Sequence, residues 1–438
     1  MTTISGQHSR GSLTLVALCF TAVIAVALAS YLMVCYRSLD LSFRDLHRSR
    51  ARILAEIGLE EALWSLNQKP AQWTSPAWTT VGTAMTRTFT GYNLGQSATG
   101  QITVTVANYT GNTPTITSVG TVSLPAGGIF IKTLVATTKP APLFGNAIAV
   151  SAGTVNFSSG GTVDSYDSRL GPYGGSNISA AAILAGTNVI ITNATIQGYA
   201  ATYGTALSRS AGLVKSLTGT SHDANRLSRS AFIPLFTVNT PLAINNYTGT
   251  VTGGSQTIGT AGGPTEYWYT SPWWGWPVDL NLSSGDTLQI NGPVKLIVTQ
   301  DLILSSSGKI QINANGRLEI FVANNVDITG TGGIINNSTS NLPKNLALFS
   351  TGMARSFTFR PSGAGAVFRG VIYSAETNAA INFTSNNPTF YGAILAQFDV
   401  NFSTPSPILH YDVALQNLSR DWFTDIATPF IINQQTEY

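Results

Sequence analysis

Charged residues are scarce in this chain of 438 residues, and acidic residues are absent from a long stretch of it. Only 10% of the residues are charged, and none between positions 62 and 163 is acidic. The net charge is +3 and the basic residues are scattered. A nucleic-acid surface needs a clustered basic stripe, so we expect no nucleic-acid partner.

Cysteine is almost absent. Cys19 and Cys35 both lie in one apolar segment, and along a helix they would be roughly 24 Å apart, too far for a disulfide. The rest of the chain has no cysteine. It must therefore be stabilised by packing and backbone hydrogen bonds.

Motifs for catalysis and metal binding are also missing. The chain has no Asp-Asp pair, no zinc-ligand spacing and no phosphate loop. Polysaccharide hydrolases need two or three close carboxylates, whereas Asp301, Glu319 and Asp327 stand singly, and we expect them on a solvated outer face. The sequence predicts a protein that is not an enzyme and has no cofactor or resident metal.

One long apolar segment, residues 11–36, contains no charged residue and is bracketed by Arg10 and Arg37. As a helix it would be about 39 Å long, more than the roughly 30 Å hydrocarbon core requires. We expect a retained single-pass anchor in the lipid bilayer. Five arginines follow the segment, and the positive-inside rule alone would place them in the cytoplasm. The β-rich body argues instead for export to the periplasm or cell surface.

A second helical pattern follows directly, over residues 38–67. Its apolar residues recur at spacings of three, four or seven, with Arg50 and Glu60 interrupting the stripe. The apolar members are Leu39, Phe43, Leu46, Ile53, Ile57 and Trp64. Two interpretations stay open: the stripe packs on its own domain, or it packs on sister helices.

These first 67 residues resemble the type IV pilin family, and within it the minor pilins and pseudopilins with PilX-like N-terminal domains. The resemblance is carried by a short basic leader, by Arg10-Gly11-Ser12, and by the run from Ala55 to Leu63. It implies that a prepilin peptidase cuts between Gly11 and Ser12, and that the helix then packs with other pilin-like subunits. Val16 stands where major pilins carry a glutamate, which implies a minor subunit or an anchored protein that never polymerises.

The remainder is rich in Gly, Thr, Ser, Asn, Val and Ile, the residues of strands and turns. We divide the chain into a leader (1–11), a transmembrane and amphipathic helix (12–67), a small antiparallel pilin-like β segment (68–142), a β-helix-like domain (143–425) and a C-terminal tail (426–438). Apolar–polar–apolar triplets start six to eight residues apart from Leu288 to Ile328, which predicts a right-handed parallel β-helix with three strands per turn. The fold class is mainly β with one long N-terminal helix.

This second segment resembles an uncharacterised domain that follows PilX-like N-termini in bacterial envelope proteins. The matching residues lie at 162–168, 370–375, 391–394 and 410–415. The resemblance implies no activity.

Two short stretches carry candidate sites. Asp164 and Asp167 could hold Ca²⁺ or could cap turns with Asx hydrogen bonds, and His410 beside Tyr411 and Asp412 suggests a structural lock on the last turn of the coil. Residues 267–276 hold four of the eight tryptophans. Trp268, Trp273, Trp274 and Trp276 could cap the coil, or could bind a glycan or another surface ligand.

The sequence favours a structural or assembly component of a type IV pilus or related system. The alternatives are a surface adhesin that uses the aromatic stretch and a β-helical polysaccharide-active enzyme.

Overall fold

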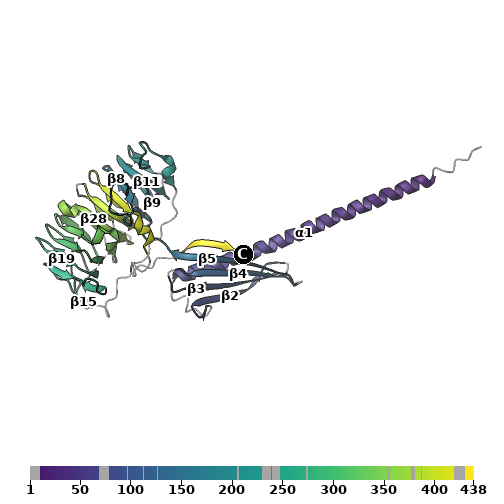
Figure 1. Ribbon diagram of the computed structural model, residues 1–438, viewed down its shortest axis with the longest axis horizontal. Coiled ribbons are helices and arrows are strands. Elements are labelled where there is room, and N and C mark those ends of the chain that lie inside the picture. Colours follow the sequence, from purple (N-terminus) through teal and green to yellow (C-terminus); the bar gives the residue numbers. More distant parts are fainter. Residues whose placement is uncertain are drawn as a thin grey trace, which may run out of the picture. The chain divides into compact units, whose positions relative to one another are not determined.

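The chain forms two compact units in the computed structural model. Unit 1 comprises Met1–Ala141 and Pro429–Tyr438, and unit 2 comprises Pro142–Thr428 (Figure 1). The structure describes residues 10–68, 78–95, 97–111, 113–125, 127–204, 207–228, 238, 247–272, 275–352, 356–375, 380–385, 387–418 and 430–438. Unit 2 is thus inserted into the sequence of unit 1.

Unit 1 begins with a single helix, α1 (Arg10–Gln68), of 59 residues. The prediction that the apolar and amphipathic segments form one helix is confirmed. From Thr14 to Leu46 the side chains are exposed, apart from the half-buried Cys35. The part Thr14–Asn67 is long and apolar enough to cross a membrane.

The small antiparallel sheet of unit 1 is also confirmed. In spatial order its strands are β1 (Thr79–Val81), β2 (Ala84–Asn93), β3 (Thr99–Ala107), β4 (Thr115–Ser123), β5 (Ile129–Pro140) and β33 (Phe430–Glu437). The last strand corrects our expectation of a C-terminal tail, because Phe430–Glu437 pairs antiparallel with β5. Asn67 at the end of α1 fixes the start of β33: its side chain accepts from the Phe430 N–H and donates to the Phe430 carbonyl.

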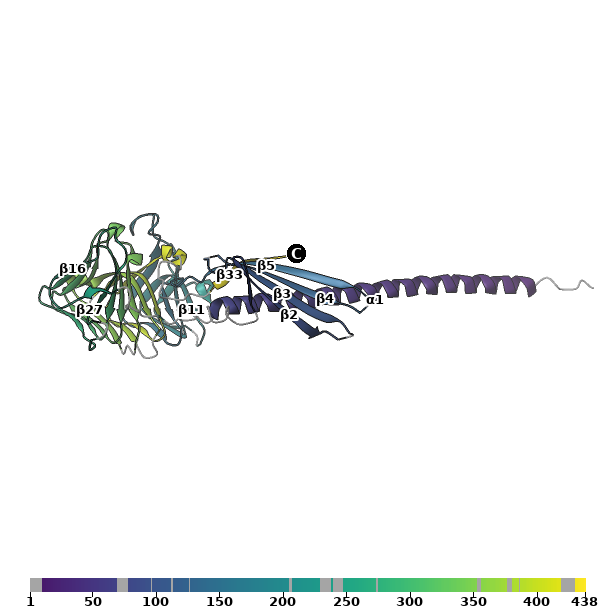
Figure 2. The ribbon, with the colours of Figure 1, turned by 90° about the horizontal axis from the view of Figure 1, so that it is seen from below.

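The second half of α1 lies along one face of this sheet (Figure 2). Small side chains allow a close approach, since a Cβ added at Gly120 would lie 2.0 Å from the Ala51 carbonyl oxygen. A Cβ added at Gly58 would lie 2.4 Å from the Ser118 Oγ. The helix residues buried against the sheet are Ala51, Leu54, Ala55, Leu59, Ala62 and Leu66. These are not the residues of the predicted stripe, which are exposed.

Unit 2 is built from three sheets of mostly short strands that pair in parallel, which confirms the β-helix-like prediction. The largest sheet contains β15 (Tyr247–Thr250), β17 (Glu266–Tyr269), β20 (Pro293–Val298), β23 (Arg317–Val322), β26 (Leu346–Ser350), β28 (Val367–Ser374), β30 (Thr389–Ala396), β32 (Ile408–Asp412), β8 (Gly161–Tyr166), β11 (Ala194–Thr202), β9 (Ala182–Gly186), β6 (Ile148–Val150), β13 (Leu213–Lys215) and β14 (Leu227–Ser228). The second contains β12 (Ser208–Ser210), β10 (Asn188–Thr192), β7 (Thr154–Phe157), β31 (Val400–Phe402), β29 (Ala380–Phe383), β27 (Ser356–Pro361), β24 (Val326–Gly330), β21 (Leu302–Leu304) and β18 (Leu280–Leu282). The third contains β16 (Gln256–Ile258), β19 (Thr287–Ile290), β22 (Lys309–Ile312) and β25 (Gly333–Asn336).

The number of strands per turn changes along the coil. From β18 to β26, successive strands visit the second, third and largest sheets in rotation, so each turn has three strands, as predicted. From β27 to β32, the described strands alternate between the second and the largest sheets only. Apolar side chains stack within the coil, as Phe383 does on Phe402 with ring centroids 4.6 Å apart.

The coil is not wound in simple sequence order. At the end of the β15–β32 series, the stack continues with strands from the beginning of unit 2: β30 pairs with β6, β31 with β7, and β32 with β8. We call this contact between β30–β32 and β6–β8 the junction. It places the first and last strands of unit 2 side by side in the middle of the stack.

Candidate functional site

The densest polar cluster lies at the junction. Because β32 pairs in parallel with β8, His410 lies opposite Asp164, and their Nδ1 and Oδ1 atoms are 2.6 Å apart. The second oxygen of Asp164 accepts from the Tyr173 hydroxyl at 2.7 Å. Asp164 and His410 are both buried, so each carboxylate oxygen has its partner inside the protein.

Planar side chains stack on this pair. The ring of His410 contacts Tyr173, at 3.6 Å between centroids, and Tyr391, at 4.7 Å, and the two tyrosine rings are 5.9 Å from each other. The Arg369 guanidinium in turn lies 3.7 Å from the centre of the Tyr391 ring. Burial and the bond to Asp164 raise the pKa of Tyr173, so its hydroxyl stays protonated and cannot serve as a base near neutral pH. These contacts join β32, β8 and the loop that follows β8. They favour a structural role for His410.

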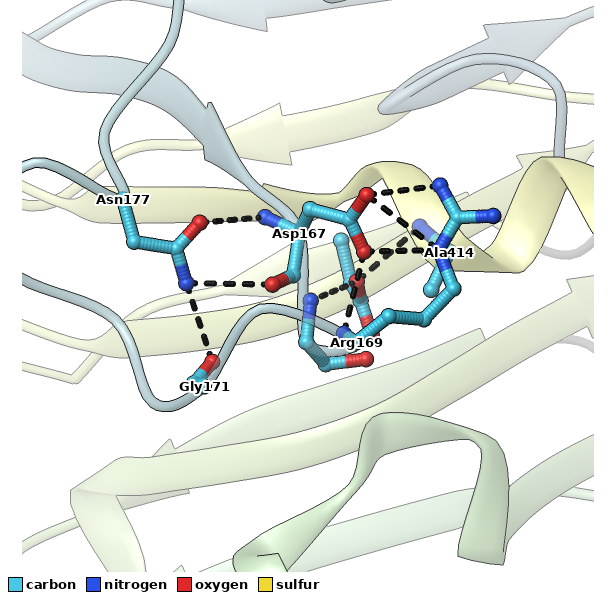
Figure 3. Close-up of polar contacts among 7 residues, drawn as sticks. Asp167, Arg169, Gly171, Asn177 and Ala414 are labelled. Atoms are coloured by element: carbon cyan, nitrogen blue, oxygen red, sulfur yellow. Dashed lines mark hydrogen bonds and ion pairs between the residues drawn. The ribbon is translucent and has the colours of Figure 1, made fainter.

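Asp167 lies in the loop that follows β8 and is held by local contacts (Figure 3). Its carboxylate binds the Arg169 guanidinium through two nitrogens, at 2.9 and 2.6 Å. The side-chain bond from Arg169 lowers the pKa of Asp167. Asn177 adds bonds to the backbone of Asp167 and to the Gly171 carbonyl. A Ca²⁺ ion at Asp164 and Asp167 would have to replace these protein partners, and the described residues contain no cluster of three metal-ligating side chains.

Asp412 ties the same loop to the end of β32. Its carboxylate accepts from the backbone N–H groups of Ser168 and Ala414 at 3.0 and 3.1 Å. Burial raises the pKa of Asp412, and the two N–H donors offset part of that effect. The loop and the last strand are thereby fixed to each other.

The structure separates the aromatic residues of 267–276. Trp268 is half-buried, its ring faces Gly249, and its indole N–H donates to Glu266 at 2.9 Å. Trp276 is 87% exposed. Trp273 and Trp274 lie outside the described residues. Of the four tryptophans predicted to form a binding surface, Trp268 thus packs within strand β17 of the largest sheet. Trp276 is exposed to solvent.

The Glu266 carboxylate accepts hydrogen bonds from the Gly259 N–H, the Thr260 hydroxyl and the Trp268 indole N–H. Burial alone would raise the pKa of Glu266, but the bonds from Thr260, Trp268 and the Gly259 N–H outweigh it, and the pKa is lowered. No sequence pattern indicates this role, because the contacts of Glu266 with Gly259 and Thr260 depend on the conformation of the turn.

The N-terminal region was predicted to carry the processing site. Gly11 and Ser12 lie within the first turn of α1, and Val16 is exposed. Further along α1, a groove of about 460 Å³ is lined by Ile53, Glu56, Ile57, Glu60, Glu61 and Trp64. The predicted stripe therefore lies on a free helix face within unit 1.

The single acidic residues do not all lie on a solvated outer face. Glu319 is buried, with its carboxylate 2.5 Å from the Arg317 guanidinium and 3.9 Å from the Lys295 amine. Asp301 accepts from the backbone of Asn325 on the next turn at 2.9 Å. Both carboxylates contact groups of neighbouring strands or turns of unit 2, which favours structural roles.

A family model described as "Domain of unknown function (DUF7305)" matches residues 245–418, which all lie in unit 2. No curated protein matches the chain. The crystal structure of the competence-associated pilin ComZ from Thermus thermophilus aligns with 90% of this chain and 97% of its own, at 12% sequence identity and a TM-score of 0.20. A TM-score this low carries no argument about fold or function.

Proposed function

We propose that this protein is a membrane-anchored, pilin-like structural or assembly subunit that displays a β-helix-like body outside the cytoplasm. The observation that carries the proposal is the unbroken helix α1. Its first half is exposed and apolar enough to span a bilayer, and its second half lies on a small antiparallel sheet. The sequence resemblance of residues 1–67 to PilX-like minor pilins supports the same proposal.

The arginines after the apolar segment bear on the proposed export of the body, because the positive-inside rule counts them. Most of them have an acidic partner nearby: Arg44 pairs with Asp40, Arg48 with Asp45, and Arg52 with Glu56. These pairs are exposed and contribute little stability, and acidic residues count little in the positive-inside rule, so the orientation is tested directly. Protease added to spheroplasts should digest unit 2 if the body is exported, and should leave it intact if it is cytoplasmic.

Mapping the N-terminus of the membrane-extracted protein tests the pilin-like part of the proposal. In cells with an active prepilin peptidase, we expect a mature chain that begins at Ser12. The variant Gly11→Val should retain residues 1–11, because a branched side chain replaces the small residue at the cut. An intact N-terminus in the wild-type protein would refute the processing.

Trp276 favours a second candidate function, a surface adhesin or glycan-binding module. An indole this exposed offers a flat apolar face on which a sugar ring can stack. We expect Trp276→Ala to reduce binding to glycan arrays or to cells at least several-fold. Leu170→Ala is a matched control, since Leu170 is 78% exposed elsewhere on unit 2. Equal binding by the two variants would remove Trp276 from this role.

A further inference from the structure

The two ends of the coil in unit 2 carry free strand edges. At one end β12, β13 and β14 each pair with a described strand on one side only, and at the other end β15, β16 and β18 do the same. We call residues 207–228 the basic end and the described residues of 247–290 the acidic end. Figure 1 shows β11, which pairs with β13 and β14, and β15 at opposite ends of unit 2. A free edge is a surface on which a strand of another chain can pair.

Positive charge predominates at the basic end. It contains Arg209, Lys215 and Arg226, and its one acidic residue, Asp223, pairs with Arg226 at 3.6 Å. Arg209 is exposed in the edge strand β12, and the half-buried Lys215 ends β13. Arg209 and Lys215 are therefore in excess over the acidic residues of this end.

Negative charge predominates at the acidic end. It contains Glu266, Asp279 and Asp286 and no lysine or arginine. The exposed Asp279 accepts from the Asp301 N–H at 3.1 Å, and the half-buried Asp286 accepts from the Ser283 N–H at 2.9 Å. Backbone N–H groups orient these carboxylates but bring no positive charge. The excess charge of this end is thus opposite to that of the basic end.

Exposed apolar side chains also lie mainly at the ends. The large apolar side chains that the described part of unit 2 exposes are Leu170, Tyr199, Leu217, Trp276 and Val278. Leu217 belongs to the basic end, and Tyr199 lies beside it in β11. Trp276 and Val278 belong to the acidic end and precede its edge strand β18. Apolar side chains grouped in this way are typical of an interaction surface.

We propose that unit 2 stacks head to tail on unit 2 of a second copy of this chain, with the basic end of one copy against the acidic end of the next. The strands at both ends belong to parallel pairs, so a copy shifted along the coil axis presents its edge strands in the direction that continues the sheets. The two surfaces are different, so each copy can hold one neighbour at each end. The association is heterologous and can continue from copy to copy.

The charges determine which ends meet. Charged side chains on an edge strand ordinarily protect it against pairing with another chain. Arg209 and Lys215 repel a second basic end in this way, but they attract the acidic end. Exposed ion pairs add little affinity. Burial of Leu217, Trp276 and Val278 therefore supplies most of the stabilisation, and the charges supply the specificity.

Cysteine cross-linking of the full-length chain in the membranes of expressing cells tests the contact. In a chain with Cys19→Ser and Cys35→Ser, the pair Leu217→Cys and Val278→Cys should give a ladder of linked chains with a short bis-maleimide. Each single cysteine variant should give almost none. Linking of chains that carry only one of the two cysteines would show that like ends meet. That result, or the lack of a ladder from the pair, would overturn the proposal.

Charge reversal in the same cysteine pair tests the specificity. Arg209→Glu with Lys215→Glu makes both ends acidic, and Asp279→Lys with Asp286→Lys makes both ends basic. Each double change should lower the yield of linked chains by about tenfold, because like charges would then face each other. Co-expression of the two reversed chains should restore the yield, which also shows that both fold. Arg360→Glu is the control, since Arg360 is an exposed residue of β27 in the middle of the stack. A yield from co-expression no higher than from either reversed chain alone would refute the stacking.

This inference goes beyond the proposed function and can fail separately from it. A ladder formed by a chain that keeps residues 1–11 would support the stacking and refute pilin-like processing. A processed chain that gives no ladder would leave the proposed function standing and overturn the stacking.

Discussion

Removal of the Asp164 carboxylate should weaken the junction as a whole. In Asp164→Ala, the imidazole of His410 and the hydroxyl of Tyr173 would both lose their acceptor. A buried polar group left without a partner costs about 1–3 kcal/mol. Two such groups would be left here, so the loss should be about 2–6 kcal/mol. Asp164→Asn should cost less, because its amide oxygen can still accept one of the two bonds.

Hydrogen exchange measured by mass spectrometry on the full-length protein in detergent is the decisive assay. Because β8 is joined to β32 through Asp164 and His410, exchange should accelerate in both strands, although they are far apart in sequence. Strands β20 and β23 should keep their protection, because the paired strands between them and the junction remain intact.

Asp327→Asn is the matched control for this experiment. Asp327 lies in β24 of the same unit, and its Oδ1 is buried without a hydrogen-bond partner, so the substitution removes no bond. Its exchange and thermal unfolding should be close to those of the wild type. If Asp164→Ala loosened β8 alone, or lowered stability no more than Asp327→Asn, the reasoning about the junction would be refuted.

Three further substitutions test the packing of unit 1 and the turn in unit 2. Gly58→Ala gains about 1 kcal/mol of helix propensity but overpacks against Ser118, Ile102 and Val104 at a cost of about 1–3 kcal/mol. The thermal midpoint should therefore fall, and Ser118→Gly should restore only the part due to Ser118. Asn67→Ala removes both bonds to Phe430 and should cost about 1–3 kcal/mol, with faster hydrogen exchange in β33. The lowered pKa of Glu266 means that its stabilisation is present above its ordinary pKa of 4.5 and is lost as pH falls through the lower folded value. Glu266→Gln should therefore destabilise the protein near pH 7, and denaturant titrations should show the difference shrinking in acid.

Local patterns were sufficient for the elements that depend on neighbouring residues. The apolar run and the helical spacing predicted α1. Within the predicted antiparallel β segment, Ile102, Val104 and Val106 alternate along β3 with all three side chains buried. The triplets from Leu288 to Ile328 predicted the strands of the three-stranded turns. In each case the physical signal is the periodicity with which one face is buried.

Features that depend on distant partners could not be predicted in this way. The face of α1 that packs on the sheet is lined by small residues such as Ala51, Ala55 and Gly58, which give a weak hydrophobic signal although they permit the closest contact. Glu319 pairs with Arg317 two residues before it and with Lys295 on the adjacent strand, and the Lys295 contact depends on strand pairing that the sequence spacing does not reveal. Strand β33 is separated in the sequence from its partner β5 by the whole of unit 2.

The winding of unit 2, in which its first and last strands pair, is consistent with its insertion into the sequence of unit 1. Pro140 and Phe430 are direct partners in the β5–β33 pair, so the chain leaves and rejoins the sheet of unit 1 at adjacent points. A coil wound from one end to the other, at roughly 4.8 Å per strand, would separate its first and last strands by tens of ångströms. The junction removes that separation, and the Tyr411 hydroxyl donates to the Phe144 carbonyl within it. An inserted coil whose ends must meet therefore needs its first and last turns to pair with each other, and the buried pair of Asp164 and His410 lies where that requirement is met.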